Sequence, residues 1–277
     1  MYVHFIILTK MKKDITIVLL FALVAYPLIV IAAHGTQSYV IFQSRGASMA
    51  PPEHFDIDEV MLPTPDGERL YAWWLRVPHA EKTILYFQEN GTNISYRTSR
   101  LRTFDKMGLN ALLIDYRGYG KSTGRIKQEA HIYNDGATAW NYLVAEKGIQ
   151  PQDIIVWGRS LGGGVAAEIA QYKNIAALIL ESTFYSLNDI ARRQYWFLPT
   201  TWLLDFRFEN GRKLKHVSAP VIIIHSQEDD YIPFGQASKL FDSASEPKTI
   251  LKTTGSHLDT IDDQEAVLAA LMAWLAL

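Results

Sequence analysis

Short apolar runs recur along most of the chain, and segments with helical spacing or polar turns separate them. Apolar runs of about four to eight residues between turn signals are typical of strands buried on both faces of a sheet. The pattern predicts strands at residues 70–77, 83–87, 111–115, 154–157, 176–180, 221–225 and 248–251. It predicts helices at residues 94–107, 131–146, 165–170, 234–244 and 263–277. This alternation predicts an α/β fold with a mainly parallel central sheet and helices on both faces.

The N-terminus has a different pattern, because residues 15–33 form an uninterrupted run without charge. As a helix this run spans about 28 Å, close to the thickness of a bilayer's hydrocarbon core. Lys10, Lys12 and Lys13 precede it, whereas Arg45 is the nearest cation that follows. The positive-inside rule then predicts a single-pass membrane protein with its main domain on the non-cytoplasmic side, periplasmic if the source is bacterial. A cleaved signal peptide is the alternative.

These patterns divide the chain into three parts. Residues 1–38 are the predicted anchor, residues 39–54 a linker, and residues 55–277 the α/β domain. Within the domain, residues 182–215 lose the alternation and are rich in aromatic side chains, as expected of a cap inserted over the sheet.

Composition removes several classes of function. The net charge of −2 and the absence of a basic stripe argue against a nucleic-acid partner. The chain has no cysteine, which excludes disulfides, thiolate metal ligands and a cysteine nucleophile. Histidines and carboxylates lack the local spacing of metal ligands, and no lysine of a phosphate-binding loop follows the glycine run at 162–164. We therefore expect neither metal nor cofactor.

The stretch from Gly158 to Gly162 reads Gly-Arg-Ser-Leu-Gly and lies between a predicted strand and a predicted helix. In this context G-x-S-x-G is typical of a nucleophile elbow, where the glycines allow a strained serine to stand above the sheet. The N-terminus of the following helix offers N–H groups to a developing oxyanion. Ser160 is therefore the candidate nucleophile; a tight turn without chemistry is the alternative.

A serine nucleophile needs a base and an acid that orients the base. In this fold the chain order is serine, acid, histidine. His257 lies between the last predicted strand and the last predicted helix, which places it on a loop above the sheet. Asp229 follows the strand that ends at residue 225 and is the preferred acid. Other carboxylates near strand ends that also qualify are Glu181, Glu228 and Asp230.

Several segments together resemble the α/β-hydrolase superfamily, and in particular the membrane-anchored alpha/beta-hydrolase domain-containing proteins of the bud-emergence type. They are NGTNISYR from Asn90, MGLNALLIDYRGYGKSTG from Met107, GRSLGGG from Gly158, ESTFYSL from Glu181 and GSHLDT from Gly255. The resemblance implies a serine hydrolase with Ser160 as nucleophile, Asp229 as acid and His257 as base. It also implies an oxyanion hole made by the backbone N–H groups of Leu161 and Asn90.

One segment departs from this family pattern. Relatives read His-Gly-Asn where this chain has Gln88-Glu89-Asn90. A Glu89 carboxylate pointing into the site would oppose the negative charge of the transition state, whereas one pointing to solvent would have no effect. The sequence leaves both possibilities open.

The hypothesis from sequence is a membrane-anchored serine hydrolase that cleaves carboxylic esters or thioesters of small-molecule or lipid-like substrates with an apolar acyl group. The aromatic insertion would form a lid over an acyl pocket or a face that touches the bilayer. Two alternatives stay open: a serine peptidase on the same fold, and a non-catalytic, membrane-tethered binding module, which the change at Gln88-Glu89 would explain.

Overall fold

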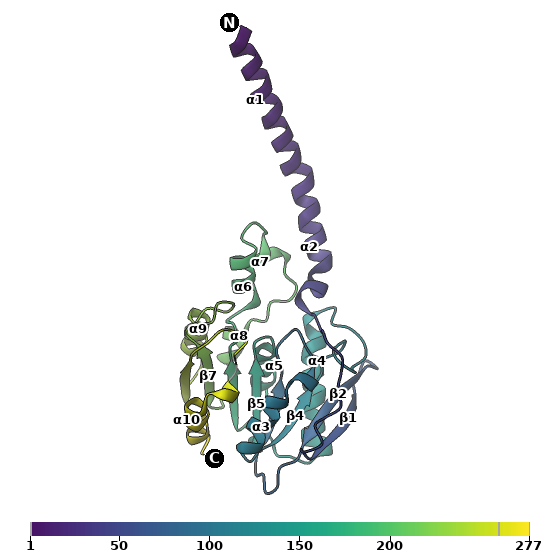
Figure 1. Cartoon of the computed structure of the whole chain (residues 1–277), viewed down its shortest axis with the longest axis vertical. Coiled ribbons are helices and arrows are strands. Elements are labelled where there is room, and N and C mark those ends of the chain that lie inside the picture. The colour runs from purple at the N-terminus through teal and green to yellow at the C-terminus, as the bar shows by residue number, and fades with distance from the viewer. Residues whose placement is uncertain (1, 260, 277) are drawn as a thin grey trace.

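The computed structural model describes residues 2–259 and 261–276, and its centre is an eight-stranded sheet (Figure 1). The strands follow one another across the sheet in the order β1-β2-β4-β3-β5-β6-β7-β8. β1 pairs with β2 and β2 with β4 in antiparallel fashion, whereas the pairs from β4 through β3 to β8 are parallel. The strand bounds are β1 Ile57–Pro63, β2 Arg69–Leu75, β3 Thr83–Phe87, β4 Asn110–Ile114, β5 Ile154–Arg159, β6 Ala177–Glu181, β7 Val221–Ser226 and β8 Lys248–Thr253.

Helices cover both faces of this sheet. Their bounds are α3 Thr98–Lys106, α4 Glu129–Asn141, α5 Gly162–Ala170, α6 Leu187–Gln194, α7 Thr200–Leu203, α8 Asn210–Leu214, α9 Gly235–Ser243 and α10 Glu265–Leu275. Ile132, Val165 and Leu240, from α4, α5 and α9, belong to the core on one face. Leu101 of α3 and Leu271 of α10 belong to the core on the other face. Strands buried on both faces must be apolar throughout, which explains the continuous runs in the sequence.

The predicted fold class is confirmed, and the predicted strands lie close to the observed ones. The strand β1 was not predicted. It lies at the edge of the sheet, exposes Glu59 and Met61 and buries only Leu62 fully, so its sequence lacks an apolar run. Edge strands commonly carry charges that discourage pairing with other chains. The predicted final helix includes Leu277, which lies outside the described residues.

The N-terminal segment is one long helix that projects away from the domain (Figure 1). It comprises α1 Tyr2–Leu20, a π-helical turn Phe21–Ala25 and α2 Tyr26–Ile41. The helix is therefore longer than the predicted 15–33, and the first residues of the expected linker are helical. The section Thr9–Ile41 is long and apolar enough to cross a membrane, and its most apolar window is not buried in the protein. A signal sequence would share these properties.

The predicted insertion at 182–215 contains α6, α7 and α8, and α6 and α7 lie on the same side of the domain as the N-terminal helix (Figure 1). We call residues 182–215 the cap. The cap contacts α2 through polar bonds: Tyr26 Oη donates to the carbonyl of Phe197 at 2.8 Å, and Gln37 Nε2 donates to Asp205 Oδ2 at 2.9 Å. Helix and cap thus stand side by side.

Candidate active site

Ser160 lies on a tight turn between β5 and α5. Its φ of +48° is in the left-handed region, which costs a residue with a Cβ on the order of 1–3 kcal/mol. Gly158 and Gly162 make the turn possible, because a Cβ on Gly158 would collide with the carbonyl of Gly162, and one on Gly162 with the backbone at the end of β3. The amide of Ser160 donates to the Glu181 carbonyl at 2.9 Å, and Thr183 Oγ1 donates to the Ser160 carbonyl at 2.6 Å. The neighbouring strand therefore holds the serine in this conformation.

The structure places the three predicted side chains in one hydrogen-bonded row. Ser160 Oγ lies 3.1 Å from His257 Nε2, and His257 Nδ1 lies 2.8 Å from Asp229 Oδ2. The other oxygen of Asp229 accepts the backbone N–H groups of Tyr231, at 3.0 Å, and Ile232, at 2.7 Å. With Nδ1 donating to the carboxylate, Nε2 of a neutral imidazole is the acceptor that faces the hydroxyl of Ser160.

Asp229 is held in its charged form. Burial opposes ionisation, but the hydrogen bonds from His257 and from the backbone N–H of Ile232 keep its pKa below the usual value. Behind it, His225 Nε2 lies 2.7 Å from the carbonyl of Ile232, and burial lowers the pKa of His225. A neutral His225 leaves His257 as the partner of the Asp229 charge.

The other candidate acids are engaged elsewhere. Glu181 accepts from Arg100 Nη2 and from Trp157 Nε1, both at 2.8 Å. Glu228 accepts the backbone N–H of Gly255 at 2.9 Å, and Asp230 is exposed. Among the described residues, none of these three carboxylates bonds to the imidazole of His257, so only Asp229 is placed to orient it.

The loop after β3, which carries Asn90, is tied down by the segment DYRGYGKS. Tyr119 Oη donates to Asn90 Oδ1 at 2.6 Å, and Tyr116 Oη donates to the Gln88 carbonyl at 2.9 Å. Asn90 Nδ2 also donates to the carbonyl of Ile41, the last residue of α2. The position of this loop therefore depends on the N-terminal helix as well as on the domain.

The predicted oxyanion donors lie on two sides of the serine. Leu161 follows Ser160 directly and precedes α5, while Asn90 lines the cleft in front of Ser160. Within residues 2–259 and 261–276, the backbone N–H of neither residue has a protein acceptor. Their role in an oxyanion hole stays a prediction.

The Glu89 carboxylate is neither an uncompensated charge in the site nor a group that points to solvent, the two possibilities that the sequence left open. It lines the cleft with 14% of its side chain exposed, but Oε1 pairs with Arg97 Nη1 at 2.7 Å and also with Arg159. Burial raises its pKa, and the Arg159 and Arg97 charges outweigh that effect and leave the pKa below the usual value. The carboxylate is ionised and compensated by two guanidinium groups.

Arg159, the second residue of the elbow, connects the loops around the site. Its Nη2 donates to the carbonyls of His257, at 2.8 Å, and Asp259, at 3.2 Å, and its Nε lies 3.4 Å from Glu181 Oε1. Together with the ion pair to Glu89, these contacts join the loop after β3, the elbow and the histidine loop. The side chain of Arg159 is only 3% exposed. Burying a cation costs free energy unless partners compensate its charge, so these partners hold the three loops in a fixed arrangement.

A cleft of about 710 Å³ lies in front of Ser160 and His257. Tyr231 forms part of its wall, and its ring centroid is 5.2 Å from that of His257. In the part of the chain that the structure describes, no group of three His, Asp or Glu side chains could hold a metal ion.

Comparison with known proteins gives the family. A family model described as serine aminopeptidase, S33, matches residues 95–210. The uncharacterized protein Rv2307c of Mycobacterium tuberculosis is 31% identical over 276 residues, which covers 96% of each chain. The alpha/beta hydrolase domain-containing protein WAV2 of Arabidopsis thaliana is 32% identical over 225 residues, 73% of each chain. The chain belongs to the α/β-hydrolase family.

A solved structure of similar fold is the esterase Pf2001 of Pyrococcus furiosus, with a TM-score of 0.71 and 18% identity over 85% of this α/β hydrolase and 97% of that chain. The fold thus matches that of a known esterase, and the relatives above confirm the resemblance to the α/β-hydrolase superfamily that the sequence motifs indicated.

Two features of this α/β hydrolase were not found from the sequence. The first is the Glu89-Arg159 bridge, although an arginine at the end of a wholly apolar strand is a signal, since buried charges require partners. The second is Tyr231, whose place beside His257 follows from the fold of the loop after β7 and has no local sequence signal.

Proposed function

We propose that this α/β hydrolase is a serine hydrolase that cleaves carboxylic esters or thioesters with an apolar acyl group. The row from Ser160 through His257 to Asp229, with separations of 3.1 Å and 2.8 Å, carries the proposal. These are hydrogen-bonding distances, as a nucleophile, base and orienting acid require. The fold similarity to esterases supports the same class of reaction.

In the proposed reaction, Ser160 Oγ attacks the acyl carbonyl carbon while His257 Nε2 takes the hydroxyl proton. The N–H groups of Leu161 and Asn90 stabilise the oxyanion of the tetrahedral intermediate. The intermediate collapses, and the alcohol or thiol leaves with the proton from His257. Water, deprotonated by His257, then attacks the acyl-serine ester and releases the carboxylic acid and free Ser160.

The proposal includes a retained, single-pass membrane anchor. The apolar section Thr9–Ile41 supports it. His34 Nδ1 lies 3.1 Å from the carbonyl of Leu203, so this part of the helix contacts the cap. The lysines before the run favour a location of the domain on the non-cytoplasmic side. Release of the protein from membranes by alkaline carbonate would refute the anchor.

A serine peptidase is the second candidate, because the matching family model is described as a serine aminopeptidase. An aminopeptidase must bind a substrate ammonium group, which favours a free carboxylate near the serine. The charged side chains that line the cleft are Arg45, Glu89, Arg97, Arg159 and Asp230. Cations outnumber carboxylates among them, Glu89 is already paired, and the charge of Asp230 is screened because its side chain is exposed. The cleft therefore favours a neutral or anionic ester over a cationic peptide.

The test compares the full-length protein with Ser160→Ala in detergent micelles. p-Nitrophenyl butyrate, a palmitoyl thioester and an alanyl p-nitroanilide are the substrates, and a fluorophosphonate probe reports on the serine. We expect ester or thioester turnover and labelling that both disappear in the Ala variant. Turnover of the anilide alone would favour the peptidase. Equal background from both folded proteins, without labelling, would favour the binding module.

A further inference from the structure

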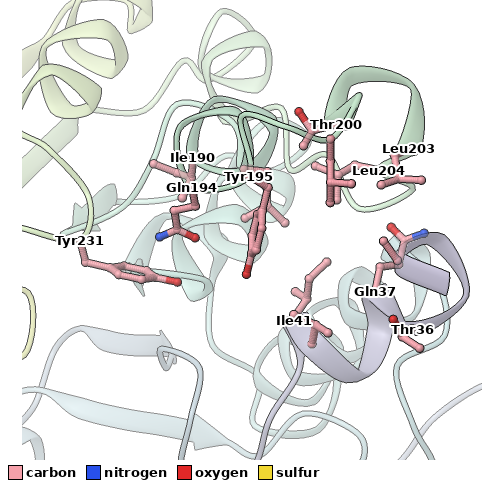
Figure 2. A pocket seen from close by; sticks show the side chains of 15 residues that line it. Thr36, Gln37, Ile41, Ile190, Gln194, Tyr195, Thr200, Leu203, Leu204 and Tyr231 are labelled. Carbon is pink, nitrogen blue, oxygen red and sulfur yellow. The ribbon is translucent and has the colours of Figure 1, made fainter. Parts of the chain in front are cut away.

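A second pocket, of about 250 Å³, lies between α2 and the cap (Figure 2). Most of the residues that line it are aliphatic or aromatic. They are Ala33, Thr36, Gln37, Val40 and Ile41 from α2, Leu187, Ile190, Ala191, Gln194, Tyr195, Leu198, Thr200, Leu203 and Leu204 from the cap, and Tyr231. In Figure 2, Ile41 and Gln37 on the helix face Tyr195 and Leu204 of the cap across this space.

The N-terminal helix supplies one whole wall of this pocket. Ala33, Thr36, Gln37, Val40 and Ile41 recur at intervals of three or four residues, which places them on one face of α2. That face runs for about 12 Å along the helix axis.

Tyr231 connects this pocket to the cleft of the active site, because it lines both. Its ring lies 5.2 Å from the ring of His257, and in Figure 2 it extends from its loop toward Gln194 and Tyr195. The pocket and the cleft in front of Ser160 therefore adjoin at Tyr231. A ligand bonded at Ser160 could extend past Tyr231 into apolar surroundings.

The same pocket borders the part of the molecule that the apolar helix would bring to a membrane. Tyr26, which bonds to the carbonyl of Phe197 at the tip of the cap, lies inside the apolar run 15–33. It is about 10 Å along the helix from Ala33. Trp196 and Trp202 of the cap are 82% and 90% exposed. Such side chains favour the membrane interface, where a segment that lies in the headgroup region buries its apolar face by about 5–10 Å.

We propose that the pocket between α2 and the cap holds the acyl chain of an ester that resides in the lipid bilayer, with its carbonyl at Ser160. The inference rests on the proposed hydrolase function and adds the substrate class and the role of the helix in binding. The substrate is a long-chain acyl ester, and its chain passes between α2 and the cap without crossing water.

The test uses full-length protein in detergent micelles and two matched substitutions, Ala33→Trp and Ala32→Trp. Ala33 lines the pocket, whereas its neighbour Ala32 is exposed and does not. We expect Ala33→Trp to lower kcat/KM for p-nitrophenyl palmitate at least tenfold more than for p-nitrophenyl butyrate. Ala32→Trp should leave the ratio of the two values unchanged. An unchanged ratio in Ala33→Trp, or the same change in both variants, would overturn the inference.

The two proposals fail in different ways. If wild type and Ser160→Ala show the same ester turnover, the hydrolase proposal fails, and the inference that rests on it fails as well. If butyrate turnover depends on Ser160 but Ala33→Trp has no selective effect on palmitate, only the inference fails.

A second arm separates a bilayer source from an aqueous one. Palmitoyl ester in phosphatidylcholine vesicles is compared with the soluble butyrate ester for wild type and for Trp196→Asp with Trp202→Asp. Charges in place of these exposed indoles oppose contact with lipid. We expect vesicle activity to fall at least fivefold more than butyrate activity. Equal loss on both substrates would show that the two indoles do not serve contact with lipid, which contradicts the proposal.

Discussion

Glu89→Ala tests whether the carboxylate in the loop after β3 stabilises the candidate site or obstructs it. The substitution leaves Arg159 and Arg97, 3% and 15% exposed, without their shared anion. Breaking a buried ion pair by removing one partner costs about 3–5 kcal/mol, because the remaining charge is uncompensated. Arg159 keeps a second carboxylate, Glu181, with Nε and Oε1 3.4 Å apart. We therefore expect the lower end, about 3 kcal/mol.

For a domain of this size a loss of 1 kcal/mol lowers Tm by about 2–4 °C, so Tm should fall by about 6–12 °C. Thermal unfolding in detergent, followed by intrinsic fluorescence, measures the change. Glu81→Ala is the matched control, because Glu81 is an exposed glutamate in the loop before β3 and should shift Tm little. Glu89→Gln keeps an acceptor for both arginines but no charge, and should fall between the two.

The same variants give a kinetic readout. Arg159 holds the carbonyl of His257, so loss of its ion pair to Glu89 should loosen the histidine loop and lower kcat for the butyrate ester. A Glu89→Ala protein with unchanged Tm and a higher kcat would refute this reasoning. It would mean that the carboxylate opposes the transition state and that the arginines do not need it.

Two further predictions concern other carboxylates. Asp229→Asn should lower kcat about 10⁴-fold with little change in Tm, because the amide cannot hold His257 in the required tautomer. A steady-state ester assay measures the change, and a fall of less than tenfold would contradict the role assigned to Asp229. Burial raises the pKa of Asp115 to about 6, so its ionised form destabilises the folded protein above that pH, and this cost disappears as pH falls toward 4. The free energy of unfolding of Asp115→Asn relative to wild type, measured by denaturant titration, should therefore be up to about 3 kcal/mol greater at pH 8 than at pH 4. A difference between the two proteins that does not depend on pH would argue against this prediction.

Much of the fold could be predicted from the sequence because its signals are local. A strand buried on both faces needs an apolar run, and β3, β5 and β7 show one each. The elbow needs small residues on both sides of Ser160, and Gly158 and Gly162 supply them. The edge strand β1 lacked such a signal, because half of it faces solvent.

The candidate site likewise has residues that local sequence signals predict and residues whose role depends on the fold. Chain order and strand ends were enough to select Ser160 and His257, and the structure places them 3.1 Å apart; that they catalyse a reaction stays a prediction. Asp229 was preferred from the sequence, but Asp230 stayed open; the structure distinguishes the two through the conformation of one loop, in which Asp229 accepts two backbone N–H groups and Asp230 is exposed.

The sequence by itself determined the strands, the elbow and the apolar N-terminal helix, since each depends on residues within a few positions of one another. Only the tertiary structure decided how the charge of Glu89 is compensated, because its partner Arg159 is seventy positions away. The same holds for the pocket between α2 and the cap, whose walls are more than 140 positions apart in the chain. Charges and apolar faces at such separations meet only when the sheet has set the loops in place. The interaction energies of these charges and apolar faces therefore depend on the tertiary structure and cannot be predicted from a local sequence pattern.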